Sequence, residues 1–566
     1  MTLSTGIYNG CALSDNGLHD RTQLHKPQAE AKRMQNYIDI MNTPQGKLDA
    51  LFTVPTLAPR GSALTPSRLA GPDTETADAL IESQQHNHKN LHIFFNDAHF
   101  HNHAAHHVLA IYALGASPEL IRAAYSIHKG YQRPAVPPAG VVTKSNWKEH
   151  LGDEQYYQSY LMFFTDLLLT DGPAVVLQEY IFSKDANFTP AKGKTERPEM
   201  VNRFIGGFLH PLIHCGYGAE FGQLGMWAEA LAETSVEHPA PAAIVPDALY
   251  EEMYSSADLA SRVASLSLSG ETRADVNSVH ALTILARISK DPVFSPEAIK
   301  LHEARGPIDL GLIARTCIDK LLKYVDEWTI GTSQEELDKK IEELIWMSTV
   351  IYAVGGWGGR NLSEDESKEF NGDFFLMHAV TSAMFLPSLS TYLAPAATAF
   401  LLKAYLVTIL SAYIIRGRPA LPLADFFATV PTPTPPRPHA TSSTDIFTFR
   451  FGPNPSMIIP PKANWLAVGA DKIYTPNPWL PLIQSTLVHP DEHLCKLQRS
   501  LMHFASVLGA TRPGAFRYLE REVEGAGKLD GTLFVRAAGL TANRLGWIRE
   551  GHAQKSWDFG GFFKTV

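Results

Sequence analysis

From about residue 90 to residue 415, the chain carries one apolar segment after another at helical spacing, with almost no polar linker between them. Domains joined by flexible tethers need such linkers, so this run predicts a single large unit. With 566 residues, of which 45% are hydrophobic, the chain can bury a large core. Patterns typical of β-strands are weak throughout. We therefore expect a mainly α fold built on one large helical domain.

The composition changes three times along the chain. Residues 1–88 are rich in proline, threonine, serine and glycine, and we expect them to pack on the body as an N-terminal arm. Residues 89–418 form the expected helical core, which should hold the functional site. Residues 419–478 contain many prolines, including the run at 431–438, and predict an irregular surface segment because helices cannot persist there. Residues 479–566 should be a helical part of the same domain.

Apolar residues at helical spacing predict the individual elements. The expected helices are 105–113, 118–125, 156–169, 173–182, 199–234, 276–288, 308–328, 334–354, 374–386, 394–415, 491–508 and 532–544. The stretch 394–415 is long and apolar enough to suggest a membrane span. Lys403, Pro395 and the ordinary alternative of a buried helix favour a core element, so we expect no membrane partner.

Charge and cysteine content narrow the class of protein. The formal net charge is -9 and no basic cluster is present, which argues against nucleic-acid binding. The four cysteines are far apart and form no Cys-x-x-Cys pair, which favours a reducing, cytoplasmic location. They are Cys11, Cys215, Cys317 and Cys495. The first residues lack the basic and apolar regions of a secretory signal.

Nucleotide and hydrolase fingerprints fail on inspection. The segment Gly216-Tyr-Gly218-Ala-Glu-Phe221 lacks the third glycine of a dinucleotide turn and follows a helical pattern. Gly527-Lys528 is followed by leucine where a P-loop needs serine or threonine. A Gly-x-Ser-x-Gly elbow is also absent. We therefore expect neither a flavin nor a nicotinamide site.

Five histidines lie within the nine residues 99–107, and they lead into apolar sequence rather than into a polar terminus. Positions four apart share one face of a helix. His99, His103 and His107 should therefore form one stripe, with His106 beside it. Imidazole can exchange a proton near neutral pH and can bind a metal in its neutral form.

Two further segments carry histidines toward the interior. His210 and His214 lie four residues apart, and Pro211 must begin or kink their helix. Asp373 should cap a helix and place His378 in its second turn. A single histidine is more often a core residue with a hydrogen bond than a functional group. Two such pairs together with His378 favour a functional site.

The imidazoles allow two chemistries. Four neutral imidazoles suit a first-row transition metal such as iron, copper or zinc. Iron sites that activate oxygen usually include an anionic ligand, and neither histidine pair brings a glutamate with it. Alternatively, histidines lining an apolar pocket could deprotonate a phenolic substrate and hold the anion without any metal.

Several segments resemble the questin oxidase-like family of fungal polyketide pathways. They are 101–118, 151–157, 207–218, 373–378 and 489–493, and the likeness extends from about residue 90 to the Trp557-Asp-Phe-Gly-Gly-Phe-Phe563 tail. The resemblance implies an oxygenase that opens the central ring of anthraquinones. The family includes Baeyer-Villiger-type enzymes of aflatoxin-, geodin- and monodictyphenone-type pathways.

The family resemblance implies two possible mechanisms. In one, no cofactor takes part, dioxygen is the co-substrate, and a reduced anthraquinone supplies the electrons. In the other, Fe(II) is held by four histidines and a carboxylated lysine. The histidines that would match are His103, His107, His210 and His214. Residues 371–378 contain no lysine and Lys368 is the nearest before them, which favours the cofactor-free mechanism.

These observations predict a Baeyer-Villiger-like oxygenase with a deep aromatic pocket. Its substrate would be an emodin- or chrysophanol-type hydroquinone, converted to a lactone that opens to a benzophenone carboxylic acid. The catalytic candidates are His103, His107, His210, His214, His378 and Asp373. The substrate-binding candidates are His99, His106, Tyr217, Trp357 and Phe374.

Alternatives remain for the aspartates and for the function. Asp373 or Asp97 could orient the basic imidazole, or each could simply cap a helix. An iron dioxygenase is the first alternative function. A non-catalytic helical scaffold that docks through residues 431–438 is the second. Apart from the small-molecule substrate, the chain could form a homodimer.

Overall fold

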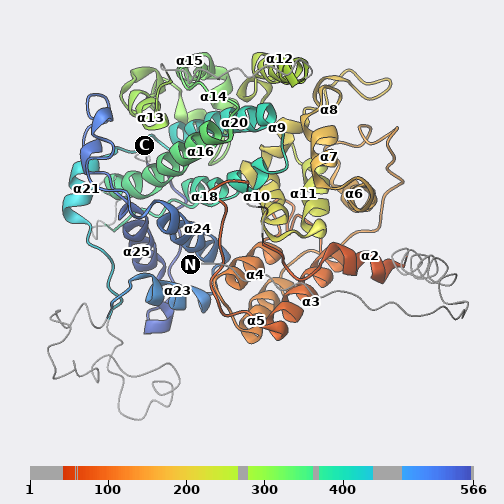
Figure 1. Ribbon diagram of the computed structural model, residues 1–566, viewed down its shortest axis with the longest axis horizontal. Coiled ribbons are helices and arrows are strands. Elements are labelled where there is room, and N and C mark those ends of the chain that lie inside the picture. Colours follow the sequence, from red (N-terminus) through yellow and green to blue (C-terminus); the bar gives the residue numbers. More distant parts are fainter. Residues whose placement is uncertain are drawn as a thin grey trace, which may run out of the picture. The chain divides into compact units, whose positions relative to one another are not determined.

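The computed structural model describes residues 43–57, 59, 61–264, 278–360, 369–436 and 475–562. Over these ranges the chain is helical, and its β pairing is limited to isolated bridges. The expected mainly α fold is therefore confirmed for the described residues (Figure 1). The chain separates into two compact units, Met1–Ala50 and Leu51–Val566, and every site discussed below lies in the second.

Helix α2 (Pro44–Leu51) comes first in the described chain. The helices that follow it form a packed group. They are α3 (Thr74–Asn90), α4 (Ala104–Ala113), α5 (Pro118–Lys129), α6 (Tyr157–Asp171), α7 (Pro173–Leu177), α8 (Lys184–Phe188), α9 (Met200–Phe204), α10 (Gly206–Phe221) and α11 (Leu224–Val236). Helices α3, α4 and α5 pack on one another, and α11 packs on both α6 and α10. The arm boundary expected at residue 88 falls inside α3, which belongs to this packed group.

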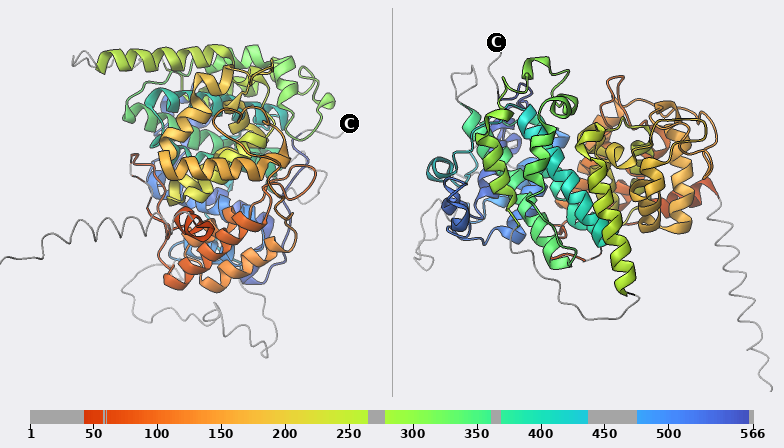
Figure 2. Two further views of the ribbon diagram at one scale, coloured as in Figure 1. Left: turned by 90° about the vertical axis from the view of Figure 1, so that its right-hand side faces the viewer. Right: turned by 90° about the horizontal axis from the view of Figure 1, so that it is seen from above.

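The later helices form a second group. They are α12 (Asp247–Ala264), α13 (Ala281–Lys290), α14 (Leu310–Thr316), α15 (Ile318–Val325), α16 (Gln334–Thr349), α17 (Gly355–Gly359), α18 (Phe374–Ala383), α19 (Leu386–Ser390), α20 (Pro395–Ile415), α21 (Leu423–Thr429), α23 (Trp479–Leu487), α24 (Glu492–Leu508) and α25 (Leu533–Leu545). Seen from above in Figure 2, the orange and yellow helices gather at one side and the green, cyan and blue helices at the other. The two groups meet where α24 packs on α4 and α18 packs on α10.

Helix α20 is apolar on nearly every side and is packed against α12, α14, α15, α16, α18 and α19. Among the described residues it is the one helix long and apolar enough to cross a membrane by length and composition. Within its most apolar window, 89% is buried inside the protein, as in the core helix of a folded domain. Its Lys403 reaches Glu252 on α12, with Nζ 2.6 Å from the carboxylate.

The structure differs from several of the expected segments. The expected helix 308–328 is divided into α14 and α15 at Cys317. The expected helix 199–234 is three helices, because the backbone adopts left-handed conformations at Gly207, Phe208 and Leu209 and again at Gly222. In the proline-rich segment, α21 forms a short helix that the composition did not predict. Residues 437–474 of that segment lie outside the described part of the chain.

Candidate functional site

The histidine-rich segment enters helix α4 later than its spacing predicts. Asn102 Oδ1 accepts the Ala104 N–H at 2.9 Å, so the helix begins at Ala104 with His103 at the N-cap position. His99 lies before the helix in a left-handed conformation, with φ of 58°. The expected stripe of His99, His103 and His107 on one helical face is therefore wrong. Only the last of the three is helical.

Pro211 begins a helix, one of the two outcomes that its position allowed. Gly207, Phe208 and Leu209 have φ values of 50°, 51° and 70°, so regular helical conformation starts at His210. Proline suits the first turn because its missing N–H would have no helical partner there. The turn also orients His210, whose Nδ1–H donates to the Gly207 carbonyl at 2.5 Å.

Five histidines meet at the junction of the two groups, two from the segment before α4 and one each from α10, α18 and α24. We call them the imidazole cluster: His101, His103, His210, His378 and His493. The rings of His101 and His210 are stacked with centroids 4.1 Å apart, and His210 Nε2 lies 2.9 Å from His103 Nε2. The His378 ring lies 5.1 Å from that of His210 and 5.3 Å from that of His493. The cluster thus includes three predicted catalytic candidates.

Two buried nitrogens of this cluster have no hydrogen-bond partner. His378 donates through Nδ1–H to the Phe374 carbonyl at 2.9 Å, and its Nε2 is unpartnered. Burial disfavours the imidazolium form and lowers the pKa of His378 well below its usual value, so the ring is neutral. A neutral ring with hydrogen on Nδ1 carries a bare lone pair on Nε2. His493 Nε2 is also unpartnered, and such orphaned buried groups are rare in folded proteins.

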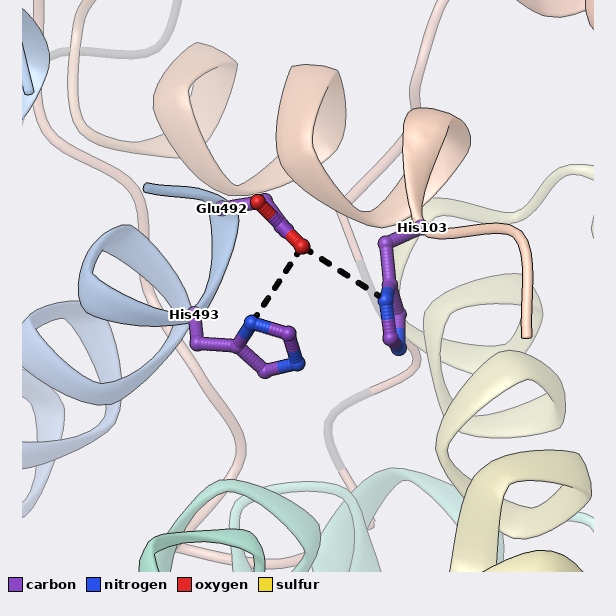
Figure 3. Close-up of side chains that lie close together, drawn as sticks. All are labelled: His103, Glu492 and His493. Carbon is purple, nitrogen blue, oxygen red and sulfur yellow. Dashed lines mark ion pairs between the residues drawn. The ribbon is translucent and has the colours of Figure 1, made fainter. Parts of the chain in front are cut away.

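A half-buried carboxylate adjoins the cluster from the first turn of α24. Glu492 Oε1 lies 3.3 Å from His493 Nδ1 and 3.8 Å from His103 Nδ1, and the three side chains converge in Figure 3. Their potential ligand atoms all lie within 4.8 Å of one another, close enough to share a metal ion. Burial would raise the pKa of Glu492, but His493 and the buried Lys496 lower it overall. Desolvation lowers the pKa of Lys496 to about 8.

Sequence reasoning missed Glu492 and His493 as site residues. They lay in a segment noted for its family resemblance and for the start of the expected helix 491–508. Asp491, whose carboxylate accepts the N–H groups of His493 and Leu494, was a visible helix-start signal. A helix start with an acid and a histidine in its first turn resembles the pattern that singled out His378.

A second network connects His106 and His214 with helix α11. His214 Nε2 lies 2.9 Å from Glu229 Oε2, and His88 Nδ1 lies 2.8 Å from the other oxygen of the same carboxylate. His106 Nε2 is 3.0 Å from His214 Nδ1, and its own Nδ1 is unpartnered. Tyr217 stacks on His106 with ring centroids 4.9 Å apart. Tyr217, a predicted substrate-binding residue, therefore contacts this second network and not the imidazole cluster.

Three buried glutamates, Glu229, Glu233 and Glu237, follow one another at intervals of four along α11 and its end. We call them the glutamate row. His101 Nε2 lies 2.8 Å from Glu237 and 3.4 Å from Glu233, and His214 Nδ1 lies 3.5 Å from Glu233. Burial and the two neighbouring carboxylates raise the pKa of Glu233 well above its usual value. A buried carboxylate needs a hydrogen-bonding or charged partner, so acids on successive turns of an apolar helix indicate such partners nearby. The sequence analysis did not use this signal.

Other predicted residues lie apart from the cluster. His107 Nδ1 is 3.0 Å from His128 Nε2, and His128 Nδ1 is 2.6 Å from the Tyr131 hydroxyl. Burial lowers the pKa of His107 to about 3 and that of His128 to about 4. His99 stacks on Phe94 and on His238, with ring centroids 4.6 and 5.6 Å apart, and neither partner belongs to the cluster.

The two aspartates have structural partners. Asp373 accepts the N–H groups at the start of α18 and forms a buried ion pair with Arg416 at 2.7 Å. This matches the capping alternative, and its described contacts include no imidazole. Asp97 is exposed and pairs with Arg133 at 3.1 Å. Neither aspartate is therefore placed to orient a basic imidazole.

The other two aromatic candidates, Phe374 and Trp357, differ in position. Phe374 contacts the rings of His378 and His493 with centroids 5.1 and 4.7 Å apart. Trp357 instead contacts Arg360 and Phe426, away from the imidazoles. Phe374 is thus the candidate that touches the cluster directly.

A cavity of about 380 Å³ lies elsewhere in the second group of helices. Its walls come from α13, from residues 418–423 and from residues 522–524. None of the predicted catalytic or substrate-binding residues lines it. The gathering of five histidines, two of them with an unpartnered nitrogen, distinguishes the imidazole cluster chemically from this cavity.

Gly207 gives a test of how tightly the cluster is held. A Cβ atom there would lie 2.7 Å from both His101 Cε1 and Glu237 Oε2, in addition to the left-handed strain. We expect Gly207→Ala to lower the free energy of unfolding by about 2–3 kcal/mol, measured by denaturant titration. Gly193→Ala is the matched control, because Gly193 has φ of 81° but nothing within 4 Å of a Cβ. Equal losses in the two variants would show that the contacts with His101 and Glu237 are not tight.

The sequence of this chain is similar to a family profile and to several fungal oxidases. A sequence profile of the questin oxidase-like family matches residues 100–501. Oxidoreductase AflY of Aspergillus parasiticus is 27% identical over 323 residues, which cover 56% of this chain and 58% of the relative. Baeyer-Villiger oxidase AgnL3 of Paecilomyces divaricatus is 28% identical over 317 residues, or 55% and 61% of the two chains. A questin oxidase of Aspergillus terreus is 30% identical over 166 residues, or 28% and 34%.

The chain thus spans 58% and 61% of the length of the first two relatives. The profile match is more extensive within this chain and contains every member of the imidazole cluster as well as Glu492 and the glutamate row. Because the match covers well over half of the sequence, this chain belongs to the questin oxidase-like family.

Proposed function

We propose that this chain is an oxygenase that inserts oxygen into the central ring of a reduced, polyphenolic anthraquinone during fungal polyketide biosynthesis. The names of two relatives, Baeyer-Villiger oxidase and questin oxidase, support an oxygen insertion on such a substrate. One structural observation carries the proposal: His378 Nε2 and His493 Nε2 are buried and unpartnered within the imidazole cluster. A neutral imidazole with a free lone pair can accept a phenolic proton.

In the proposed reaction, His378 Nε2 accepts a phenolic proton from the hydroquinone form of the substrate. The phenolate transfers electron density to a central-ring carbon, which forms a bond with dioxygen. A ring carbon then migrates to the inner peroxide oxygen as the O–O bond breaks, and His378 returns its proton to the departing oxygen. One hydroquinone and one dioxygen thereby give one seven-membered lactone and one water. Hydrolysis of the lactone would give a benzophenone carboxylic acid.

The reaction can be tested with an emodin- or chrysophanol-type hydroquinone. The substrate is reduced with dithionite, mixed with the purified chain without oxygen, and then exposed to dioxygen without added flavin, nicotinamide or metal. We expect a lactone that contains one more oxygen atom than the oxidised anthraquinone, or the acid formed from it by addition of water, with one ¹⁸O atom incorporated when ¹⁸O₂ is used. The oxidised anthraquinone is the control and should give no product, because it supplies no electrons.

Failure with every reduced anthraquinone would contradict the proposal. It would favour the non-catalytic scaffold, in which the proline run 431–438 is the docking segment. Only part of that run lies in the described chain.

An Fe(II) dioxygenase is the second candidate, and Glu492 is the observation that favours it. The sequence showed no anionic ligand beside either histidine pair, whereas the structure places Glu492 next to His103 and His493. Two histidines and one carboxylate are the ligand set of many non-heme iron oxygenases, so these residues fit the metal. Bound iron would activate dioxygen, and His378 would remain a base for the substrate. Lys496, buried one turn after Glu492, is our candidate for the lysine implied by the family resemblance.

Metal analysis of active protein separates the two mechanisms. The cofactor-free proposal expects full turnover in protein that contains far less than one iron per chain and has been treated with a chelator. Stoichiometric iron, loss of turnover on chelation and recovery on adding Fe(II) would instead establish the second candidate. Glu492→Gln should then lower iron content, while the equally conservative Glu154→Gln, outside the cluster, should not.

A further inference from the structure

The tail motif Trp557-Asp-Phe559 joins the beginnings of the two helices that carry His378 and His493. Trp557 Nε1–H donates to the Asp491 carboxylate, the cap of α24, at 3.0 Å. The Asp558 N–H donates to the Gly372 carbonyl at 3.0 Å, and the Phe374 N–H at the start of α18 donates to the Asp558 carbonyl at 2.9 Å. The tail therefore lies against both helix starts.

The backbone of the tail is held from two further directions. Asp558 accepts from Arg544 Nη2 at 2.8 Å and from the Gly372 N–H at 2.8 Å. The Phe559 carbonyl accepts from Arg416 Nη2 at 2.8 Å, and the same guanidinium pairs with Asp373. These contacts fix the main chain but not the Phe559 side chain, and this residue is 55% exposed.

The aromatic rings run from solvent to the imidazole cluster. The Phe559 ring stacks on that of Phe374 with centroids 4.8 Å apart and an interplanar angle of 30°. Phe374 in turn contacts His378 and His493, which are both buried. Phe559 is thus the outer layer of a stack whose inner ring contacts the two imidazole rings that carry an unpartnered nitrogen.

We propose that Phe559 is the outer ring of a substrate-binding stack, and that a planar polycyclic aromatic ligand enters the cluster by inserting between Phe559 and Phe374. This rests on the proposed function for its substrate class. Insertion replaces one ring–ring contact by two, and offset stacking is favourable for each. The Phe559 side chain can rotate outward while its anchored backbone keeps the ring at the mouth of the site. Phe559 would therefore favour flat, multi-ring substrates over single phenols.

Binding of oxidised 1,8-dihydroxyanthraquinone, measured by quenching of tryptophan fluorescence, tests the stack without turnover. Phe559→Ala should weaken binding about 3- to 10-fold, the size expected for one aromatic pair, and Phe559→Tyr should restore it. A single-ring phenol should be affected less. Tyr518→Ala is the matched control, since Tyr518 is a 69% exposed aromatic residue far along the chain from the tail motif. In turnover, Phe559→Ala should raise KM with little change in kcat.

The outcomes distinguish this inference from the proposed function. Binding that depends on Phe559 in a protein that turns over no hydroquinone would support the stack and contradict the oxygenase. Turnover by a protein whose probe affinity is unchanged in Phe559→Ala would overturn the stack alone. No measurable binding of the probe by the parent chain would also overturn the stack.

Discussion

Replacing His378 by alanine is expected to lower turnover of a reduced anthraquinone by about 100-fold or more, because positioned proton transfer commonly contributes 10²–10⁴ to an enzymatic rate. His378 is the predicted catalytic residue whose Nε2 lone pair faces no partner. The measurement is kcat with dithionite-reduced substrate. Added imidazole should restore part of the activity by entering the vacated space.

Stability measurements must accompany this variant. His503→Gln is the matched control, since His503 is equally buried, bonds to the Leu64 carbonyl through Nε2 and also has an unpartnered ring nitrogen, but lies outside the imidazole cluster. His378→Gln and His503→Gln should shift Tm by similar small amounts, while only His378→Gln loses turnover. A His378 variant that melts far below the parent, yet keeps full activity in its folded fraction, would show that this histidine is structural.

A His→Gln series extends the test to the other candidates. The positions are 103, 107, 210, 214 and 378. In the acid–base mechanism, the variant at position 378 should lose most activity and respond to imidazole. Loss of activity in all five, without rescue, would mean that the rings act as a unit, as metal ligands do.

Local signals predicted much of this fold. Apolar periodicity located the major helices, because each buries one face whatever lies opposite. Pro211 and Asp373 marked helix starts, because their chemistry suits the first turn alone. As a result, the sequence placed His210 and His378 correctly within their helices.

The assembly of the site could not be predicted in the same way. His103 meets His210 although the two lie 107 positions apart in the sequence, and no local pattern specifies which helices will pack together. The predicted alignment of His99, His103 and His107 on one helical face was wrong for a different reason, because periodicity cannot show where a helix begins. Asn102 caps α4 at Ala104 and leaves His103 outside it. Long-range packing also brings Glu492 next to His103. This carboxylate supplies the anionic ligand that the sequence did not show, and it is why iron binding remains the second candidate.

Stability of the folded chain should depend on pH through the glutamate row. Desolvation by itself raises the pKa of Glu229, but hydrogen bonds from His214 and His88 outweigh it and lower that pKa from 4.5 to about 2. A carboxyl with a lowered folded pKa contributes stability above its unfolded pKa of 4.5 and loses it as the pH falls toward 2. Its contribution at neutral pH is about 3 kcal/mol. Glu233 has a raised pKa, so its contribution is present below 4.5 and is lost as the pH rises.

The two isosteric variants should therefore shift stability in opposite directions. At pH 7, Glu229→Gln should lower the free energy of unfolding by about 3 kcal/mol, because both histidines lose a charged acceptor. It should also remove most of the stability loss between pH 4.5 and 2. Glu233→Gln should raise Tm at pH 7, because a neutral amide needs no proton uptake between two carboxylates. Denaturant titrations of parent and variants from pH 2 to pH 8 measure both effects, and a Glu233→Gln variant less stable than the parent at pH 7 would show that this carboxyl is charged in the folded chain.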